Sequence, residues 1–329
     1  MSTGSGRLIG IARHAVGAVV CTALLASSLG AHAPAFACDL CAIYIGTEQR
    51  ESRTGLFGGI AEQYSDYETL QRGGKQVPNP AGERLHSFIT QVVVGYNFTP
   101  RIALQINVPL ITRDFRRQEA SGIVNGDESG LGDLSLLGSW AAYIGVTENT
   151  IARLTLLGGL KLPSGNSRRL KEELRESGDV ESGIHGHDLA LGSGSVDGIV
   201  GAQLFWSGRR VFLTGAVQYL LRTEGDFDYQ FANDLIWSGG PGEFILLTHQ
   251  YTVGVQAELT GESKGNDTLA GVRGTDTAIT ALYLGPDVRF TWGTSLGANL
   301  AVDLPVLQNN SALQIVPNFR LRGGATWRF

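Results

Sequence analysis

The sequence has little charge, one methionine, three cysteines and, after its N-terminal segment, no long hydrophobic run. Charged residues make up 17% of the 329 residues, and the formal net charge is −5. This acidic balance argues against a nucleic-acid partner, because proteins that bind nucleic acids carry basic patches. After residue 37 no stretch is apolar over the roughly 18 residues that a membrane helix needs. If the mature chain lies in a membrane, it must therefore cross as strands.

Glycine is abundant instead, with 45 residues, roughly twice its usual share. High glycine, low charge and a mean hydropathy near zero are typical of a sheet protein that turns one face to lipid. They also fit a glycine-rich secreted protein. Composition therefore leaves both classes open, and the length allows one large barrel or two ordinary domains.

The N-terminus has the features of a secretory signal peptide. Arg7 and Arg13 form a basic start, residues 15–29 form a short apolar run, and an A-x-A cleavage site follows. We expect residues 1–37 to be removed, so that the mature chain begins at Cys38. A lipoprotein is the alternative, because a cysteine follows the cleavage site. The phenylalanine within that site, however, stands where a lipobox has a small residue.

Cys38 and Cys41 form a C-x-x-C pair at the start of the mature chain. Covalent haem attachment needs a histidine next, and Ala42 stands there instead. A thioredoxin-type site needs a strand-to-helix context, which is absent here. Two interpretations stay open: a local disulfide in an oxidising compartment, or metal capture by two thiolates with further ligands from a partner.

Residues 313–329 show a clear alternation of apolar and polar residues. Every second residue back from Phe329 is apolar or small, including Trp327, and the residues between them include Arg320 and Arg322. A period of two predicts a strand with two different faces. A strand with an apolar outside, a polar inside and a terminal aromatic residue is typical of bacterial outer-membrane barrels. Taken alone, the segment also fits an edge strand of a soluble sandwich.

The same alternation recurs along the chain and predicts about twelve strands joined by alternating short and long connections. Outer-membrane barrels show this asymmetry, with short periplasmic turns and long extracellular loops. We therefore predict an all-β fold, a transmembrane antiparallel β-barrel over residues 54–329 in the bacterial outer membrane, preceded by a periplasmic segment at 38–53. The predicted strands are 54–67, 85–98, 101–112, 131–143, 151–162, 196–206, 211–222, 229–237, 244–260, 277–292, 295–306 and 313–329. The short connections are predicted near positions 99, 145, 207, 239 and 293, and the long ones near 73, 113, 163, 224, 261 and 308.

Aromatic residues near the short-turn ends of these strands predict an interfacial girdle. Tryptophan and tyrosine favour the headgroup layer, because one part of each ring system is apolar and the other polar. The predicted girdle consists of Tyr96, Phe98, Trp140, Tyr143, Phe205, Trp206, Trp237, Phe290, Trp292, Trp327 and Phe329.

Inward-facing positions of the predicted barrel carry charges of both signs. Twelve strands enclose more space than side chains must fill, but much less than a large porin does. Opposed charges in a narrow lumen predict ion pairs across it, which either satisfy one another or form a polar constriction that screens solutes. The candidates for this lumen wall are Asp133, Arg153, Lys161, Asp197, Glu258, Asp287, Arg289, Asp303, Arg320 and Arg322.

The longest predicted loop, 163–194, contains a charged run at 168–175 and a His-x-His-Asp cluster with His185 and His187. Such a cluster can bind a metal ion. On a glycine-flanked loop it is more often plain solvated chain, so the two histidines are weak metal candidates.

The sequence lacks the motifs of common catalytic sites, such as G-x-S-x-G, H-E-x-x-H and a phosphate-binding loop. The enzyme alternative for such a barrel is an outer-membrane phospholipase, with an outward-facing histidine near a serine at the membrane rim. His249 is the candidate on a strand, and it has no obvious serine partner. We therefore predict that the protein is not an enzyme and needs no cofactor.

Several short runs recur in an order and spacing that cover most of residues 54–329. The runs are SGLGDL (129–134), GLKLPSG (159–165), GSGSVD (192–197), LGPD (284–287) and DLPV (303–306). They resemble the phenol-degradation meta-pathway family of outer-membrane proteins. The resemblance implies a transporter-like barrel for small, often hydrophobic compounds, and the family offers no agreed catalytic residues. The C-x-x-C opening departs from the general pattern of this family.

Two functions of different class follow from these observations. One is the uptake of a small, hydrophobic or aromatic solute through a channel or transporter-like barrel. The other is a barrel scaffold that docks a periplasmic metal or redox protein through Cys38 and Cys41, with copper as a metal that suits thiolates. Outer-membrane lipid is a partner in both.

Overall fold

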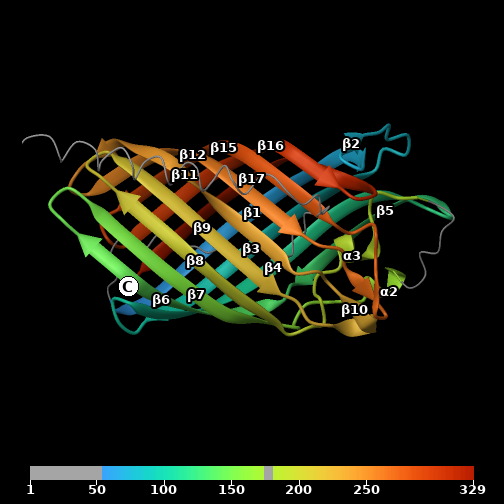
Figure 1. The fold of residues 1–329 in the computed structure, drawn as a ribbon, viewed down its shortest axis with the longest axis horizontal. Helices are drawn as coiled ribbons and strands as arrows, with labels where there is room; N and C mark the ends of the chain where they lie inside the picture. Colours follow the sequence, from blue (N-terminus) through green and yellow to red (C-terminus); the bar gives the residue numbers. More distant parts are fainter. Residues whose placement is uncertain (1–53, 174–180) are drawn as a thin grey trace, which may run out of the picture. The chain divides into compact units, whose positions relative to one another are not determined.

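The computed structural model describes residues 54–173 and 181–329. The expected signal peptide and the segment with Cys38 and Cys41 lie outside these residues. The described chain is almost entirely β-sheet (Figure 1), and no helix within it has the length and apolar character to cross a membrane. The long strands are β1 (Gly55–Arg72), β3 (Arg84–Asn97), β4 (Ile102–Glu119), β6 (Leu134–Val146), β7 (Ile151–Leu162), β8 (Asp197–Ser207), β9 (Val211–Leu221), β11 (Asp234–Leu247), β12 (Tyr251–Lys264), β15 (Ile279–Trp292), β16 (Leu296–Asn310) and β17 (Leu313–Arg328). The short elements are β2 (Lys75–Gln76), β5 (Gly122–Leu131), β10 (Tyr229–Gln230), β13 (Thr268–Leu269), β14 (Val272–Arg273), α2 (Leu170–Glu173), α3 (Gly186–Leu189) and the 3₁₀ turn η3 (Asp226–Asp228).

The long strands pair in chain order into one antiparallel sheet, and the last strand closes on the first. β17 pairs with β1 from Phe57↔Arg328 to Arg72↔Leu313. Closure removes the sheet edges, whose unpaired N–H and C=O groups would find no partner in lipid. The prediction of a twelve-stranded antiparallel barrel is therefore confirmed. Figure 1 shows its strands running obliquely side by side, with α2, α3 and β10 at the long-loop end.

The two faces of the strands differ as the alternation predicts. On β3, Phe88 and Val94 are 44% and 52% exposed, whereas Ile89 and Val93 on the opposite face are 3% exposed. The same contrast recurs around the barrel, so the exposed large apolar side chains form a continuous outer belt. Soluble monomers do not expose apolar patches of this extent. The belt is the surface that a lipid bilayer covers.

The aromatic girdle is present at the short-turn end, with two corrections. Trp140, Trp292 and Trp327 are exposed on the outer face as predicted. Phe205, by contrast, is buried on the inner face, because it lies an even number of residues from the inward Asp197. Trp237 lies three residues after the start of β11, at the long-loop end, because β11 begins later than the alternation suggested.

The run Gly239-Gly240-Pro241-Gly242 is part of β11 and not a turn, contrary to the prediction. The turn is at 248–250, where the Thr248 amide donates to the Tyr251 carbonyl at 3.0 Å. The glycine run instead makes room for a neighbouring side chain. A Cβ at Gly242 would lie 2.2 Å from the inward ring of Phe212 on β9. His249 therefore lies in a tight turn and not on a strand.

Two connections at the long-loop end also differ from the prediction. The segment 113–130, expected to be a loop, mostly continues β4 and forms β5, and the two pair from Leu110↔Leu131 to Glu119↔Gly122. The last connection, expected to be long, consists of residues 311 and 312 between β16 and β17. The barrel therefore carries a projecting hairpin at one place and a tight turn at another.

Candidate functional site

The connection between β7 and β8 folds into the lumen. Its described parts, 163–173 and 181–196, are called the lumen loop below. Leu191 in this loop is 1% exposed and packs against Ile89 of β3 and Ile111 of β4. Both isoleucines belong to the inner face of strands that do not adjoin β7 or β8. The lumen loop therefore lies inside the barrel and is not the solvated loop that the sequence predicted.

A second apolar cluster fixes the middle of the lumen loop to the other side of the barrel. Ile184 and Leu189 pack with Tyr67 of β1, Phe115 of β4 and Ile315 of β17. Strands β1 and β17 lie far around the barrel from β7 and β8. The loop thus reaches across the lumen and closes its long-loop end.

Polar groups of the opposite wall bind the backbone of the same loop. Arg113 of β4 donates from its guanidinium to the carbonyl oxygens of Asp188 and Ala190, the latter at 3.0 Å. Glu83 accepts from the backbone amide of Gly183 at 2.7 Å. These bonds satisfy loop groups that would otherwise be buried without a partner, which is costly.

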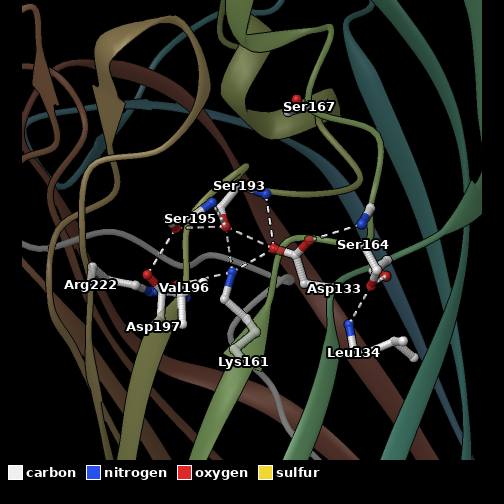
Figure 2. A network of polar contacts seen from close by, with 12 residues as sticks. Asp133, Leu134, Lys161, Ser164, Ser167, Ser193, Ser195, Val196, Asp197 and Arg222 are labelled. Carbon is white, nitrogen blue, oxygen red and sulfur yellow. Dashed lines mark hydrogen bonds and ion pairs between the residues drawn. The ribbon is translucent and has the colours of Figure 1, made fainter.

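Three of the predicted lumen residues meet in one buried network where the loop leaves the wall (Figure 2). The Lys161 ammonium lies 2.5 Å from Asp133 and 2.9 Å from Asp197. It also donates to the hydroxyl of Ser193 in the lumen loop at 2.6 Å. Arg222 completes the group with a 2.8 Å contact to Asp197. Two cations therefore balance two carboxylates, and a loop residue is bonded into the same network.

His187 is buried in α3 and is held by two acids. Its Nδ1 lies 2.9 Å from Glu173 and its Nε2 lies 3.3 Å from Asp188, while the ring stacks between His185 and Tyr229. Burial alone would lower the pKa of His187, but the carboxylates of Asp188 and Glu173 outweigh it and raise the pKa to about 10. Burial would likewise raise the pKa of Glu173, but His187 lowers it to about 2. This geometry uses both nitrogens of an imidazolium, whereas a metal ion would need a free nitrogen lone pair.

A cavity of about 300 Å³ occupies the lumen, and its lining extends from Glu262 near the long-loop end of β12 to Arg328 at the short-turn end of β17. One side of it, formed by β12, β15, β16 and β17, carries ion pairs. Arg322 lies 2.7 Å from Asp303 and 2.9 Å from Glu258. Arg289 lies 2.7 Å from Asp287. The other side, formed by β1 to β9, is lined mainly by neutral amides and hydroxyls, including Gln63, Gln91, Thr155, Gln203, Thr214 and Gln218.

Arg320 lies nearer the long-loop end of β17 than Arg322 does, and it joins β17 to β12, which is not its neighbour in the sheet. Its guanidinium is 3.5 Å from Glu262 of β12 and 4.4 Å from the ring centre of Tyr283 on β15. The prediction was of ion pairs across the lumen, whereas these ion pairs run between strands along one side of it. The partners come from strands β12 and β17, which the pairing order places two strands apart, on either side of β15 and β16.

Arg153 lies near the short-turn end of β7 and donates to the Thr155 hydroxyl at 3.2 Å. Arg328 of β17 lines the same cavity and was not among the predicted lumen residues. The inward phenylalanines Phe212 and Phe244, which pack with Phe205 at this end, were not predicted either. Phe212 lies an even number of residues from Gln218 on one strand, so the alternation itself could have placed it inside.

The wall is incomplete between β16 and β17. Their backbone pairing ends at Asp303↔Arg320, although both strands continue beyond it. A proline lies beyond the last pair on each strand, and proline cannot donate to a ladder. Farther along, the Gln308 side chain donates to the Pro317 carbonyl at 2.7 Å. Side chains therefore hold this part of the wall where backbone bonds are missing.

A possible cation-binding group outside the lumen also escaped the sequence analysis. Asp66, Glu68 and His86 lie at the long-loop end of β1 and β3, with their ligand atoms within 4.8 Å of one another. His86 Nε2 lies 3.3 Å from Asp66, and Asn318 donates to the same carboxylate at 3.2 Å. The local contacts alone account for this arrangement.

Solved structures resemble this chain in fold. The crystal structure of the COG4313 outer membrane channel from Pseudomonas putida F1 matches with a TM-score of 0.59 at 16% identity, covering 87% of this chain and 100% of that one. The beta domain of the Bordetella autotransporter BrkA (TM-score 0.42, 12% identity, 83% and 99% covered) and the CymD monoaromatic hydrocarbon channel (0.35, 7%, 84% and 89%) are less similar. Neither a scan of protein families nor a search of curated proteins finds a match. Together with the apolar belt, the first likeness identifies the fold as a bacterial outer-membrane β-barrel.

Proposed function

We propose that the protein is an outer-membrane channel that takes up a small solute with an apolar or aromatic body, and that the lumen loop is its gate. The observation that carries this proposal is the cavity of about 300 Å³ on the short-turn side of the lumen loop. A barrel that served only as a membrane scaffold would have no need for such a space. Its volume lies at the lower end of the range of about 300–1,000 Å³ for small-molecule pockets. It therefore suits a compound with a single ring.

The lining of the cavity supports a solute that combines apolar and polar parts. Phe205 and Tyr283 contribute ring surface, while Arg289 and Arg322 contribute charge. The resemblance to the phenol-degradation meta-pathway family points to the same class of compound. The fold likeness to an outer-membrane channel is consistent with passage through the lumen.

The lumen loop suits a gate because it is attached by contacts of two kinds. Apolar contacts through Ile184 and Leu191 exclude water from the closed state. Ion pairs around Lys161 and His187 can be broken one at a time by substitution or by pH. A plug held in this way can open without unfolding the wall, because the ladders are made between the strands themselves; the loop adds to them a backbone bond from the Ile315 amide of β17 to the Gly183 carbonyl at 2.9 Å.

Reconstitution of the mature chain tests the proposal. The chain in liposomes should admit single-ring aromatic compounds faster than disaccharides, and in planar bilayers it should pass ions in discrete steps. Freeing the lumen loop with Lys161→Met should raise both signals. The proposal is wrong if folded protein passes neither ions nor aromatic compounds, with or without this substitution.

A further inference from the structure

A chain of ion pairs on one side of the cavity contains more carboxylates than guanidinium groups. Arg322 lies 2.7 Å from Asp303 and 2.9 Å from Glu258. Arg289 lies 2.7 Å from Asp287 and 3.8 Å from Glu258. All five side chains line the same cavity. Three carboxylates therefore share two guanidinium groups, and in the described part of the chain this ion-pair group carries one negative charge in excess.

The carboxylate of Asp287 keeps one oxygen without a hydrogen-bond donor. Asp287 is 0% exposed. Its Oδ2 accepts from Arg289 at 2.7 Å, and Asn299 also approaches this carboxylate. Within residues 54–173 and 181–329, Oδ1 has no hydrogen-bond partner. A buried acceptor that lacks a donor is costly, so a ligand that donates to Oδ1 removes this cost when it binds.

Gln256 supplies a second acceptor of the same kind. It is the register partner of Asp287 on the neighbouring strand β12, and its side chain is also buried on the inner face. Cβ atoms at directly paired positions lie about 4.5–5.5 Å apart, so one small group can reach both side chains. The Gln256 amide nitrogen donates at 2.6 Å to Thr214, which lines the cavity. Its Oε1 accepts from no group among the residues that the structure describes.

Aromatic rings lie next to these two acceptors. Gly254 is two residues from Gln256 on the same face of β12, and a Cβ there would lie 2.9 Å from the Phe212 ring. The ring centres of Phe212 and Phe244 are 4.7 Å apart. Phe205 packs with both and lines the cavity. Ring surface and surplus negative charge therefore meet in one part of the lumen.

We propose that this part of the lumen is a binding site for small organic amines with an aromatic ring, in which the ammonium group donates to Asp287 and Gln256 and the ring lies toward Phe205. This inference names the charge of the solute that the proposed channel takes up, so it rests on that function. An ammonium group has three N–H donors and no acceptor, so it suits a site whose unpaired atoms are acceptors. Its hydrogen bond to a carboxylate is charge-assisted, and its charge offsets the surplus of the ion-pair group. The face of a phenylalanine ring also attracts a cation.

The site distinguishes solutes of equal size by their head groups. A carboxylate would bring another negative charge beside Asp287 and Glu258, and it has no hydrogen to donate. An alcohol can donate one hydrogen bond but brings no charge. Benzylammonium, benzyl alcohol and benzoate present nearly the same ring with these head groups. The ammonium ion, which has no ring, separates the effect of the head group from that of the ring.

Titration calorimetry on the full mature chain in a neutral detergent measures binding. At neutral pH, benzylammonium should bind roughly tenfold more tightly than benzyl alcohol or the ammonium ion, and benzoate should show no measurable binding. Asp287→Asn keeps the shape of the side chain and should remove the preference for benzylammonium over benzyl alcohol. Gln256→Glu adds a carboxylate and should bind benzylammonium severalfold more tightly than the parent protein does.

Glu243→Gln is the matched control. Glu243 is the register partner of Val255, which adjoins Gln256, but its side chain is exposed on the outer face of β11. The substitution therefore removes a carboxylate from the same level of the wall and should leave the preference for benzylammonium unchanged. Retarded migration of unheated protein on gels verifies that each variant folds.

Equal affinity for benzylammonium and benzyl alcohol, or an unchanged preference in folded Asp287→Asn, would overturn the site. Ammonium ion that binds as tightly as benzylammonium would do the same, because the site would then hold a simple cation. If Asp287→Asn does not fold, unchanged affinity for benzylammonium in Gln256→Glu decides against the site. Uptake of aromatic compounds by proteoliposomes without a preference for the amine would support the channel and refute the site. Benzylammonium binding without uptake would refute the channel and support the site.

Discussion

Replacing Lys161 with methionine should open the lumen loop. Methionine has similar length but no charge, so the substitution leaves Asp133 and Asp197 buried beside each other. Breaking a buried ion pair by removing one partner costs about 3–5 kcal/mol. The lower end of this energy range applies to Lys161→Met, because each carboxylate keeps other hydrogen-bond donors. Asp133 keeps the Ser193 amide at 2.9 Å, and Asp197 keeps Arg222 at 2.8 Å.

The penalty falls mainly on the closed state. When the lumen loop leaves, water reaches both carboxylates and solvates them, so the open state avoids most of the cost. A difference of about 3 kcal/mol corresponds to about a hundredfold change in the ratio of open to closed molecules. Planar-bilayer recordings of Lys161→Met should therefore show a large rise in open probability over the parent protein.

Two further variants make this prediction specific. Lys171→Met removes an exposed lysine of the same loop and should leave the open probability unchanged. Adding Asp133→Asn to Lys161→Met removes one of the two uncompensated charges and should restore much of the closed state. If folded Lys161→Met conducts like the parent protein, the network does not hold the gate.

Three further groups of outcomes are expected, for Arg322, for the pair of His187 and Glu173, and for the ladder between β16 and β17. Arg322→Gln leaves two carboxylates without their shared cation, so the bilayer reversal potential should move toward cation selectivity. Because Arg322 is 23% exposed, the unfolding free energy in urea should fall by only about 2 kcal/mol; an unchanged reversal potential would contradict a lumen role. Protonated His187 stabilises the loop fully below its ordinary pKa of 6.5, and this contribution is lost as pH rises through the raised pKa of about 10, so conductance should increase between pH 7 and 10 and His187→Gln should remove the increase. The pKa of Glu173 is lowered from 4.5 to about 2, so ionised Glu173 stabilises its pair with His187 fully above pH 4.5. This stabilisation is lost as pH falls through about 2, and acid should therefore open the loop only near that pH. The ladder between β16 and β17 is missing at 304–310 and 313–319, so amide hydrogen exchange should be faster there than at 296–303 and 320–327, where the two strands pair. Equal exchange rates would argue against a weak wall.

The strand pattern was readable in the sequence because it is a local property. Adjacent residues of a strand point to opposite faces, so lipid on one side and a wet lumen on the other leave a period of two in each segment. This is why residues 85–98 and 313–329 could be assigned from their letters alone. Strand ends were harder to predict where the residue type is determined by contact with a neighbouring strand. The glycine run at 239–242 looks like a turn until the ring of Phe212 is placed against it.

The site depended on contacts between distant parts of the chain. The sequence placed Glu258 and Arg322 on the inner face with the correct charges, but only the pairing order of the sheet, with β15 and β16 between their strands, brings them within 2.9 Å. The lumen loop was harder, because its charged and histidine-rich residues are also typical of a solvated loop. Its partners, such as Arg113 for the Ala190 carbonyl, lie far away in the sequence.

The sequence by itself therefore determined the barrel, its strand number and the direction of each face, because lipid and water act on every strand separately. Tertiary structure alone decided what the lumen contains. It turned an apparently exposed loop inward and divided inward charges into a network that holds this loop and a second network at mid-depth. Those pairings depend on which strands lie near one another in the closed barrel, and no local sequence pattern encodes this order.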